Sequence, residues 1–151
     1  MAETLQEASE KGHLAVVQAL LAAGANVHAN NDYALGAASQ KGHLAVVEVL
    51  LAAAADVHAE DDGALRAASA YGHVAVVEVL LAAGANVHAD NDALRWASEN
   101  GHLAVVEVLL AAAADVHSDN DNALRWASSS GHVAVVEVLK RPHVLRSGRR
   151  Y

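Results

Sequence analysis

Histidine is the residue type of this chain with the widest chemical range, because imidazole binds metal ions and also transfers protons. The 151 residues include ten His and no Cys, which excludes thiolate ligands, disulfides and thiol nucleophiles. Nine of the His fall into two regularly spaced series. The first is His13, His43, His73, His102 and His132, and the second is His28, His58, His88 and His117.

The spacing of these His argues against a metal site. Successive members of a series are 29 or 30 residues apart, as expected for one position of a repeating structural unit. Stacked helices lie about 10 Å apart, whereas imidazoles that share a zinc ion each lie about 2.1 Å from it. The stretch Asp119–Asn122 resembles a calcium loop only loosely, because calcium needs about six to eight converging oxygens. We therefore expect no metal ion and no cofactor.

Nucleophilic catalysis is not indicated either. One Ser precedes the Gly-His pair in several units, so no Ser, His and Asp form a set that occurs once in the chain. These residues are Ser39, Ser69, Ser98 and Ser128. A stack of similar units offers a long groove rather than one closed pocket. The sequence predicts a protein that is not an enzyme.

The chain consists of five similar units. Their Gly-His pairs begin at Gly12, Gly42, Gly72, Gly101 and Gly131. Each unit contains a short segment such as ALRWASEN and a longer one such as GHLAVVEVLLAA. In the longer segment, Leu44, Val47, Leu50 and Leu51 are spaced as on one face of a helix. Neither helix is long enough to be stable alone, so each pair requires its neighbours.

The units resemble ankyrin repeats. The resemblance rests on Gly-His-Leu, Val-Val and Leu-Leu in the second segment and on closing sequences such as GANVH, and it covers about residues 4–140. The Thr-Pro-Leu-His that opens the common repeat of about 33 residues is missing; the second unit has Tyr33-Ala34-Leu35-Gly36 instead. In this respect the chain resembles the short ankyrin repeats of giant viruses and protists. The near-identity of its units would also fit an engineered or consensus-derived chain.

The resemblance implies an all-α, ankyrin-type helix-turn-helix solenoid of five stacked helix pairs with short connecting loops. It implies that the first His series lies near the start of the second helices and that the second series hydrogen-bonds across the loops. We expect one domain over residues 1–140, followed by a basic tail over residues 141–151. The expected helical units are about 4–23, 34–53, 64–83, 93–112 and 123–140.

The loops between units lead to two expectations about local structure. Gly24 and Gly84 end their helices, whereas Ala54 and Ala113 occupy the same position in other units. If the backbone there is left-handed, Ala is less stable than Gly by on the order of 1 kcal/mol. One Asp further along each loop is expected to cap the next helix. These residues are Asp32, Asp62, Asp92 and Asp121.

The resemblance also implies a binding surface on the concave face, at the loop tips and the last residues of each first helix. These positions differ between units while the flanking scaffold barely changes. Such variation is expected of a binding surface and also of exposed positions under no constraint. The predicted partner-binding residues are Tyr33, Gln40, Lys41, Asp61, Ala70, Tyr71, Asn91, Glu99, Asn100, Asn120, Ser129 and Ser130.

Two Trp allow two interpretations. Trp96 and Trp126 replace a Leu that ankyrin repeats bury, so they are either larger core residues between repeats or aromatic anchors in the groove. Arg95 and Arg125 precede them. We expect these Arg to stack and to form ion pairs between neighbouring repeats.

Charge is divided unevenly along the chain. Residues 1–139 carry 18 acidic and 5 basic side chains, whereas residues 140–151 carry five basic side chains and no acid. An acidic body repels phosphates, so we expect no nucleic acid, and it favours a basic partner. We expect no membrane span and no signal peptide. The compartment is unassigned, with the cytoplasm expected if the protein is natural.

The basic tail over residues 141–151 allows two arrangements. Val144 and Leu145 would cover the last unit, or the basic side chains would lie on an acidic groove of the same or a neighbouring copy, which would allow self-association. The whole sequence predicts a non-catalytic protein–protein interaction module that binds a protein or basic peptide on its concave face. The competing interpretation is an engineered or consensus repeat scaffold, a structural protein with no natural ligand.

Overall fold

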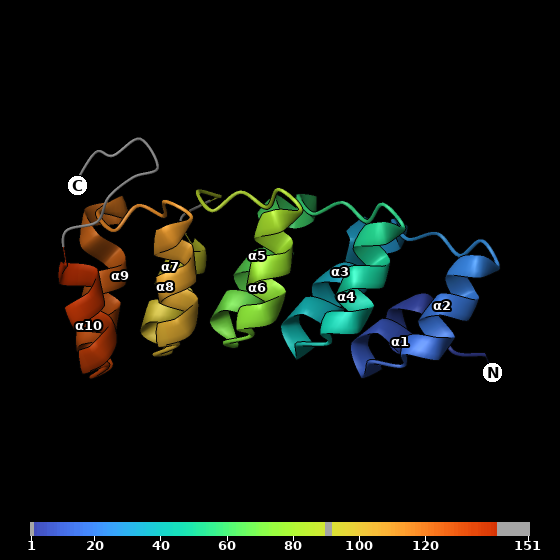
Figure 1. Cartoon of the computed structure of the whole chain (residues 1–151), viewed down its shortest axis with the longest axis horizontal. Coiled ribbons are helices and arrows are strands. Elements are labelled where there is room, and N and C mark those ends of the chain that lie inside the picture. The colour runs from blue at the N-terminus through green and yellow to red at the C-terminus, as the bar shows by residue number, and fades with distance from the viewer. Residues whose placement is uncertain (1, 90–91, 142–151) are drawn as a thin grey trace.

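The computed structural model describes residues 2–89 and 92–141, and within them the chain forms ten α-helices and no strand. The first helices of the five units are α1 (Leu5–Lys11), α3 (Ala29–Lys41), α5 (Ala59–Ala70), α7 (Asp92–Glu99) and α9 (Ser118–Ser129). The second helices are α2 (Leu14–Ala22), α4 (Leu44–Ala52), α6 (Val74–Ala82), α8 (Leu103–Ala111) and α10 (Val133–Lys140). The five pairs stand side by side in chain order (Figure 1). The predicted all-α solenoid is confirmed.

The core runs through the whole row of helix pairs. In α4, Val46, Val47 and Leu50 are buried, whereas Leu44 and Leu51 are half-buried and pack against the core. Each second helix contacts its own first helix and the second helix of the next unit. The buried face of the helix is therefore wider than a single apolar stripe. This explains why Val46 is buried although it is not among the residues whose spacing predicted the apolar face.

A close joint between units forms at each Gly-His turn, where the Gly of one unit meets the His of the next. Gly72 has a φ of +79°, and a Cβ on it would lie 2.5 Å from Nδ1 of His102. On its other side, the imidazole of His102 bonds to the carbonyl oxygen of Ala70, 2.9 Å from Nε2. A carbonyl only accepts, so Nε2–H donates. We call this contact the Gly-His joint.

The joint recurs along the solenoid. His43 donates from Nε2 to the carbonyl of Glu10 at 2.9 Å, and His73 donates to that of Gln40 at 2.8 Å. His13 belongs to the first of the five units, and its Nδ1 lies 2.9 Å from a carboxylate oxygen of Glu3. The first His series does lie at the starts of the second helices.

The loops contain a second joint between units, and it corrects the expected role of the Asp residues. Asp32 has a φ of 57° and its carboxylate is nearly buried. Its Oδ1 accepts from the backbone N–H of Asp56 at 2.8 Å and lies 3.0 Å from Nδ1 of His28. Asp62 repeats this arrangement with Asn86 and His58. In the described part of the chain neither carboxylate caps its own helix; each fixes the loop of the next unit.

The segment around each of these Asp residues is a left-handed turn. In three of the loops, three successive residues have φ between 51° and 60°. They are Asn30, Asn31 and Asp32, then Glu60, Asp61 and Asp62, then Asp119, Asn120 and Asp121. Asn and Asp tolerate this conformation best, which explains the composition of the loops and leaves Glu60 as the strained member.

The ends of the second helices follow the stereochemical expectation. Ala54 and Ala113 have φ of 69° and 71°, as Gly24 and Gly84 have 91° and 98°. Ala55 donates to the carbonyl of Leu50 at 3.0 Å, which closes the helix in the usual left-handed motif. The predicted left-handed backbone at Ala54 and Ala113 is confirmed. A side chain there carries strain of about 1–2 kcal/mol.

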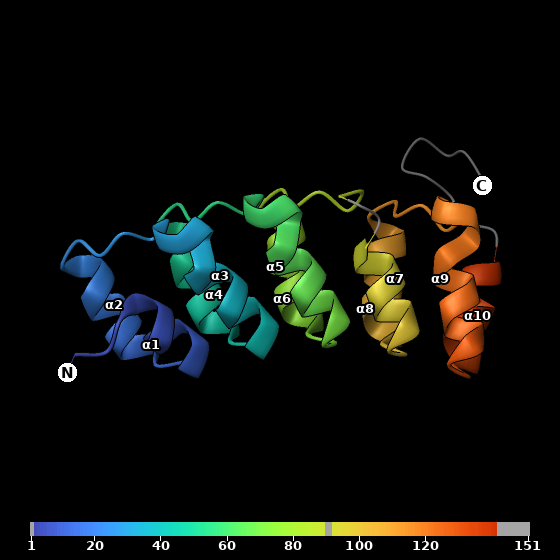
Figure 2. The same ribbon diagram turned by 180° about the vertical axis from the view of Figure 1, so that it is seen from behind.

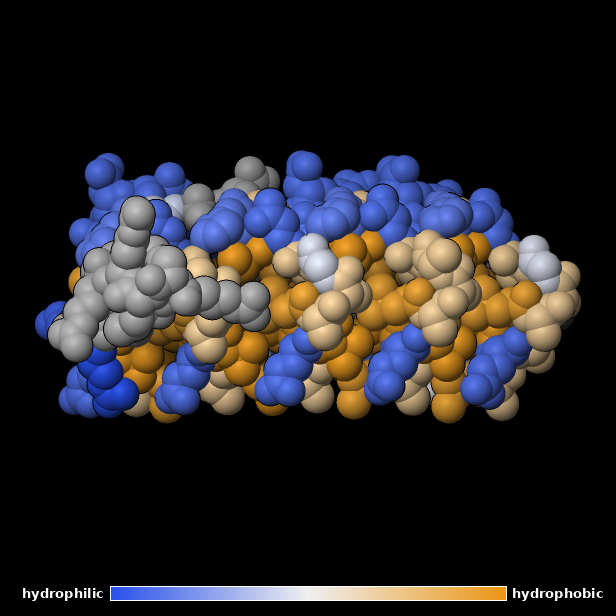
Figure 3. Space-filling view, turned by 45° about the horizontal axis from the view of Figure 1, so that its top comes forward, coloured by the Kyte–Doolittle hydropathy of each residue, from blue (hydrophilic) through white to orange (hydrophobic). Residues whose placement is uncertain are grey.

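The second helices present an unusually apolar surface. Four of them contain one polar residue each, and these residues, Gln18, Glu48, Glu78 and Glu107, are exposed. The corresponding face is largely hydrophobic with regularly spaced hydrophilic patches, beneath a hydrophilic band along the loops (Figure 3). Within the described ranges no helix has the length and apolarity to span a bilayer.

Because of the Gly-His joint, we expect a Gly→Ala substitution to have different effects on stability at two Gly residues with similar backbone φ. Gly72 and Gly131 have φ of 79° and 76°, but no described atom lies within 4 Å of a Cβ on Gly131. We expect Gly72→Ala to lower the free energy of unfolding by about 1–3 kcal/mol more than Gly131→Ala, because only Gly72 faces an imidazole. Chemical denaturation followed by circular dichroism measures both, and equal losses would contradict the joint.

Candidate functional site

Two adjoining hollows open between the first helices, which lie in front in Figure 2. The α3–α5 hollow has a volume of about 300 Å³, and the α5–α7 hollow has about 840 Å³. Both are lined by Gln40, Gly63 and Ala67, so the two form one continuous groove.

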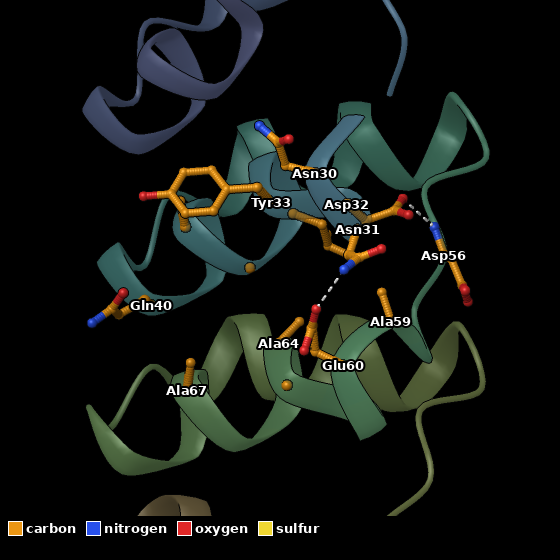
Figure 4. A pocket seen from close by; sticks show the side chains of 14 residues that line it. Asn30, Asn31, Asp32, Tyr33, Gln40, Asp56, Ala59, Glu60, Ala64 and Ala67 are labelled. Carbon is orange, nitrogen blue, oxygen red and sulfur yellow. Dashed lines mark hydrogen bonds between the residues drawn. The ribbon is translucent and has the colours of Figure 1, made fainter. Parts of the chain in front are cut away.

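The α3–α5 hollow is negatively charged. Its charged lining residues are Asp32, Asp56 and Glu60, and it contains no basic side chain. The side chain of Asn31 donates across it to a carboxylate oxygen of Glu60 at 2.9 Å (Figure 4). Tyr33 lines its rim, 48% exposed.

The α5–α7 hollow is aromatic and positively charged. Arg66 is its only charged lining residue, and Tyr71 and Trp96 supply its aromatic surface. Tyr71 is 57% exposed, and its hydroxyl accepts from the side-chain amide of Gln40 at 3.3 Å. The amide of Asn100 donates to the carbonyl of Ala70 at 3.1 Å, the same carbonyl that closes a Gly-His joint. The scaffold therefore holds one edge of the hollow in place.

Beyond the second hollow, the guanidinium of Arg95 lies between two indole rings. Its Cζ is 4.6 Å from the ring centroid of Trp96 and 5.2 Å from that of Trp126, in the next unit. Nη2 lies 3.9 Å from a carboxylate oxygen of Glu99, one turn along the same helix. The expected ion pair between repeats is wrong for Arg95; the contact between repeats is the stacking on Trp126. Trp126 is 38% exposed, so the core interpretation is wrong for it.

The hollows bring together some of the predicted partner-binding residues and leave others apart. Gln40, Ala70, Tyr71 and Asn100 line the α5–α7 hollow, and Tyr33 lines the other. Asp61 and Asn120 lie in left-handed turns and line neither hollow. Glu99 pairs with Arg95. Outside the hollows, Lys41, Ser129 and Ser130 are exposed at the ends of their helices. Asn91 and residues 142–151 lie outside the described residues.

Sequence reasoning missed Arg66, which together with Glu60 gives the two hollows opposite signs. A signal for Arg66 was present, because it shares its position with Arg95 and Arg125 while the second unit has Gly36 there. The sequence does not show that the missing side chain of Gly36 and Gly63 leaves room between neighbouring helices.

The repeated Ser and His residues form no reactive centre in the described residues. Ser39, Ser69 and Ser98 are fully buried, and their hydroxyls have no hydrogen-bond partner there. These three act as small packing residues, as predicted, whereas Ser128, in the last unit, is exposed, so the prediction is wrong for it. Among residues 2–89 and 92–141, no three His, Asp or Glu side chains are grouped so that they could hold a metal ion.

Comparison with family models agrees with this geometry. A model of ankyrin repeats in three copies matches residues 5–91 and again residues 65–144. This chain belongs to the ankyrin repeat family. Ankyrin repeats are generally protein–protein interaction modules without catalytic activity. A search of curated proteins found no match.

The stacked guanidinium leads to a prediction for this ankyrin repeat protein. Arg95→Ala removes the guanidinium that contacts both Trp96 and Trp126, so we expect the free energy of unfolding to fall by about 1–2 kcal/mol. The tryptophan fluorescence should shift to longer wavelength as the rings become more exposed. Arg125→Ala is the matched control at the same position of the last unit, where the residue is exposed; we expect a change below about 0.5 kcal/mol. Equal losses in the two variants would show that the stack adds nothing.

Proposed function

We propose that this ankyrin repeat protein binds a protein or peptide segment on the face of its first helices, over the two adjoining hollows. One observation carries the proposal. Of the four large hydrophobic side chains exposed in the described residues, Tyr33, Tyr71 and Trp126 belong to first helices or end one. Exposed aromatic side chains beside a hollow are typical of the residues that dominate protein interfaces.

The charge of the loop edge supports a partner with basic groups. Glu60 and Asp61 in one loop and Asp119 in another are exposed. Such an edge attracts positive charge at long range and speeds the encounter, while the aromatic groove supplies contact area. An engineered scaffold without a natural ligand remains the competing interpretation, and it predicts no selective binder.

Selection from a library of short random-sequence peptides on the immobilised full chain tests this proposal. We expect selected peptides to lose about tenfold or more in affinity when Tyr71→Ala and Trp96→Ala are combined, because aromatic anchors carry much of the binding energy. The control combines Glu78→Ala and Glu107→Ala on the second helices and should leave the affinity unchanged. A library that yields no selective peptide, or equal losses in both double variants, would favour the scaffold interpretation.

We also propose that the basic tail lets copies of the chain associate, since residues 141–151 carry positive charge and the α3–α5 hollow carries negative charge. Light scattering of the full chain and of a version that ends at Lys140, at low and high salt, measures this. We expect only the full chain to associate, and only at low salt, because screening weakens contacts between exposed charges. Two monomeric proteins, or association that survives high salt, would contradict it.

A further inference from the structure

The two hollows have opposite charge, and this restricts what the groove accepts. We propose that the bound segment presents an anionic side chain to Arg66 in the α5–α7 hollow and a cationic side chain to the α3–α5 hollow. The proposal rests on the proposed function and adds the chemistry of the partner. It differs from the uniformly basic partner that the net charge of the chain indicates.

The donors of the α5–α7 hollow favour an anion. Arg66 has no ion pair in the described part of the chain, and its one hydrogen bond is a long contact of 3.5 Å to the backbone carbonyl of Glu60. A guanidinium offers several N–H donors in a geometry that matches a carboxylate. The hydroxyl of Tyr71 accepts from Gln40, so its own hydrogen is available to donate. Trp96 adds an apolar ring and an indole N–H, which donates hydrogen bonds and does not accept them.

The acceptors of the α3–α5 hollow favour a cation. Glu60 accepts from the neutral amide of Asn31 across the hollow, and Asp32 and Asp56, whose side chains point away from Glu60 (Figure 4), add negative charge at its edge. The neutral amide satisfies this oxygen without cancelling the charge of Glu60. With no basic side chain in its lining, this hollow keeps a negative potential that a Lys or Arg of the partner would neutralise.

The order of the hollows sets where the two charges of the bound segment must lie. The hollows share Gln40, Gly63 and Ala67, so a chain that crosses from α3 to α7 passes the acidic hollow first and Arg66 second. A segment that lies with its charges the other way round along the groove would place like charges together in both hollows. Such juxtaposition is unfavourable, so it selects the orientation in which a segment with both charges lies in the groove.

Selection of random-sequence peptides on three full-length proteins tests this assignment: the unchanged chain, Arg66→Glu, and Arg125→Glu as the matched control. Arg125 has the same position in the last unit, is exposed, and lines neither hollow. We expect the unchanged chain to enrich peptides that carry both an acidic and a basic residue. These peptides should bind Arg66→Glu about tenfold more weakly or worse, and Arg125→Glu as before.

A second variant keeps the test independent of folding. Arg66→Gln removes the charge and keeps a long polar side chain; we expect it to weaken the same peptides while leaving the melting temperature unchanged. In a Trp126→Phe background, Trp96 is the one remaining tryptophan, and its fluorescence reports binding in the hollow. Changing the acidic residue of a selected peptide to Lys should restore binding to Arg66→Glu.

Three results would overturn the assignment. Selected peptides without an acidic preference, or peptides that bind unchanged and Arg66→Glu proteins alike, contradict the role of Arg66 while the proposed function stands. Equal losses in Arg66→Glu and Arg125→Glu indicate only a long-range effect of charge. A complete absence of selective peptides contradicts the proposed function itself, and the assignment with it.

Discussion

The architecture depends on the contact between a Gly and the His of the following unit. The imidazole occupies the space that a Cβ on the preceding Gly would fill, and its Nε2–H donates to a carbonyl two residues before that Gly. One residue pair thus turns the chain, closes a helix and fixes the distance to the next unit. Contacts between units, such as the Gly-His joint, connect nearest neighbours. The free energy of unfolding of such a protein is therefore close to a sum of the stabilities of its units and of the interfaces between them.

The loops also hold neighbouring units together, on the other side of the stack. Asp32 and Asp62 each accept a backbone N–H from the next unit and face a His of their own loop. Asp121, in the last unit, keeps its His contact, but its side chain is 48% exposed. For Asp32 and Asp62 the N–H donor lies 24 residues further along the chain, whereas for Asp121 that position is residue 145, outside the described residues.

The Gly-His joints and the Asp contacts of the loops constrain both edges of the stack. The residues that can differ from unit to unit therefore lie on the first helices. Gly36, Arg66, Arg95 and Arg125 share one position of the unit but lie in different surroundings. Arg66 faces a wide hollow, while Arg95 is held between two indoles. A uniform scaffold therefore carries a non-uniform groove, in which charge changes sign from one interface between units to the next.

The sequence by itself determined the period, the helix pairs and the family, because helix spacing, Gly-His turns and Asn- and Asp-rich loops are local patterns. It also determined the left-handed backbone at Ala54 and Ala113, since the stereochemistry of a helix end depends on a few adjacent residues. Only the tertiary structure decided that Asp32 serves the next unit, that Trp126 is exposed, and that Arg66 faces an aromatic hollow. These outcomes depend on side chains about 30 residues apart that meet only when the units stack, and a repeat pattern gives their spacing without their orientation.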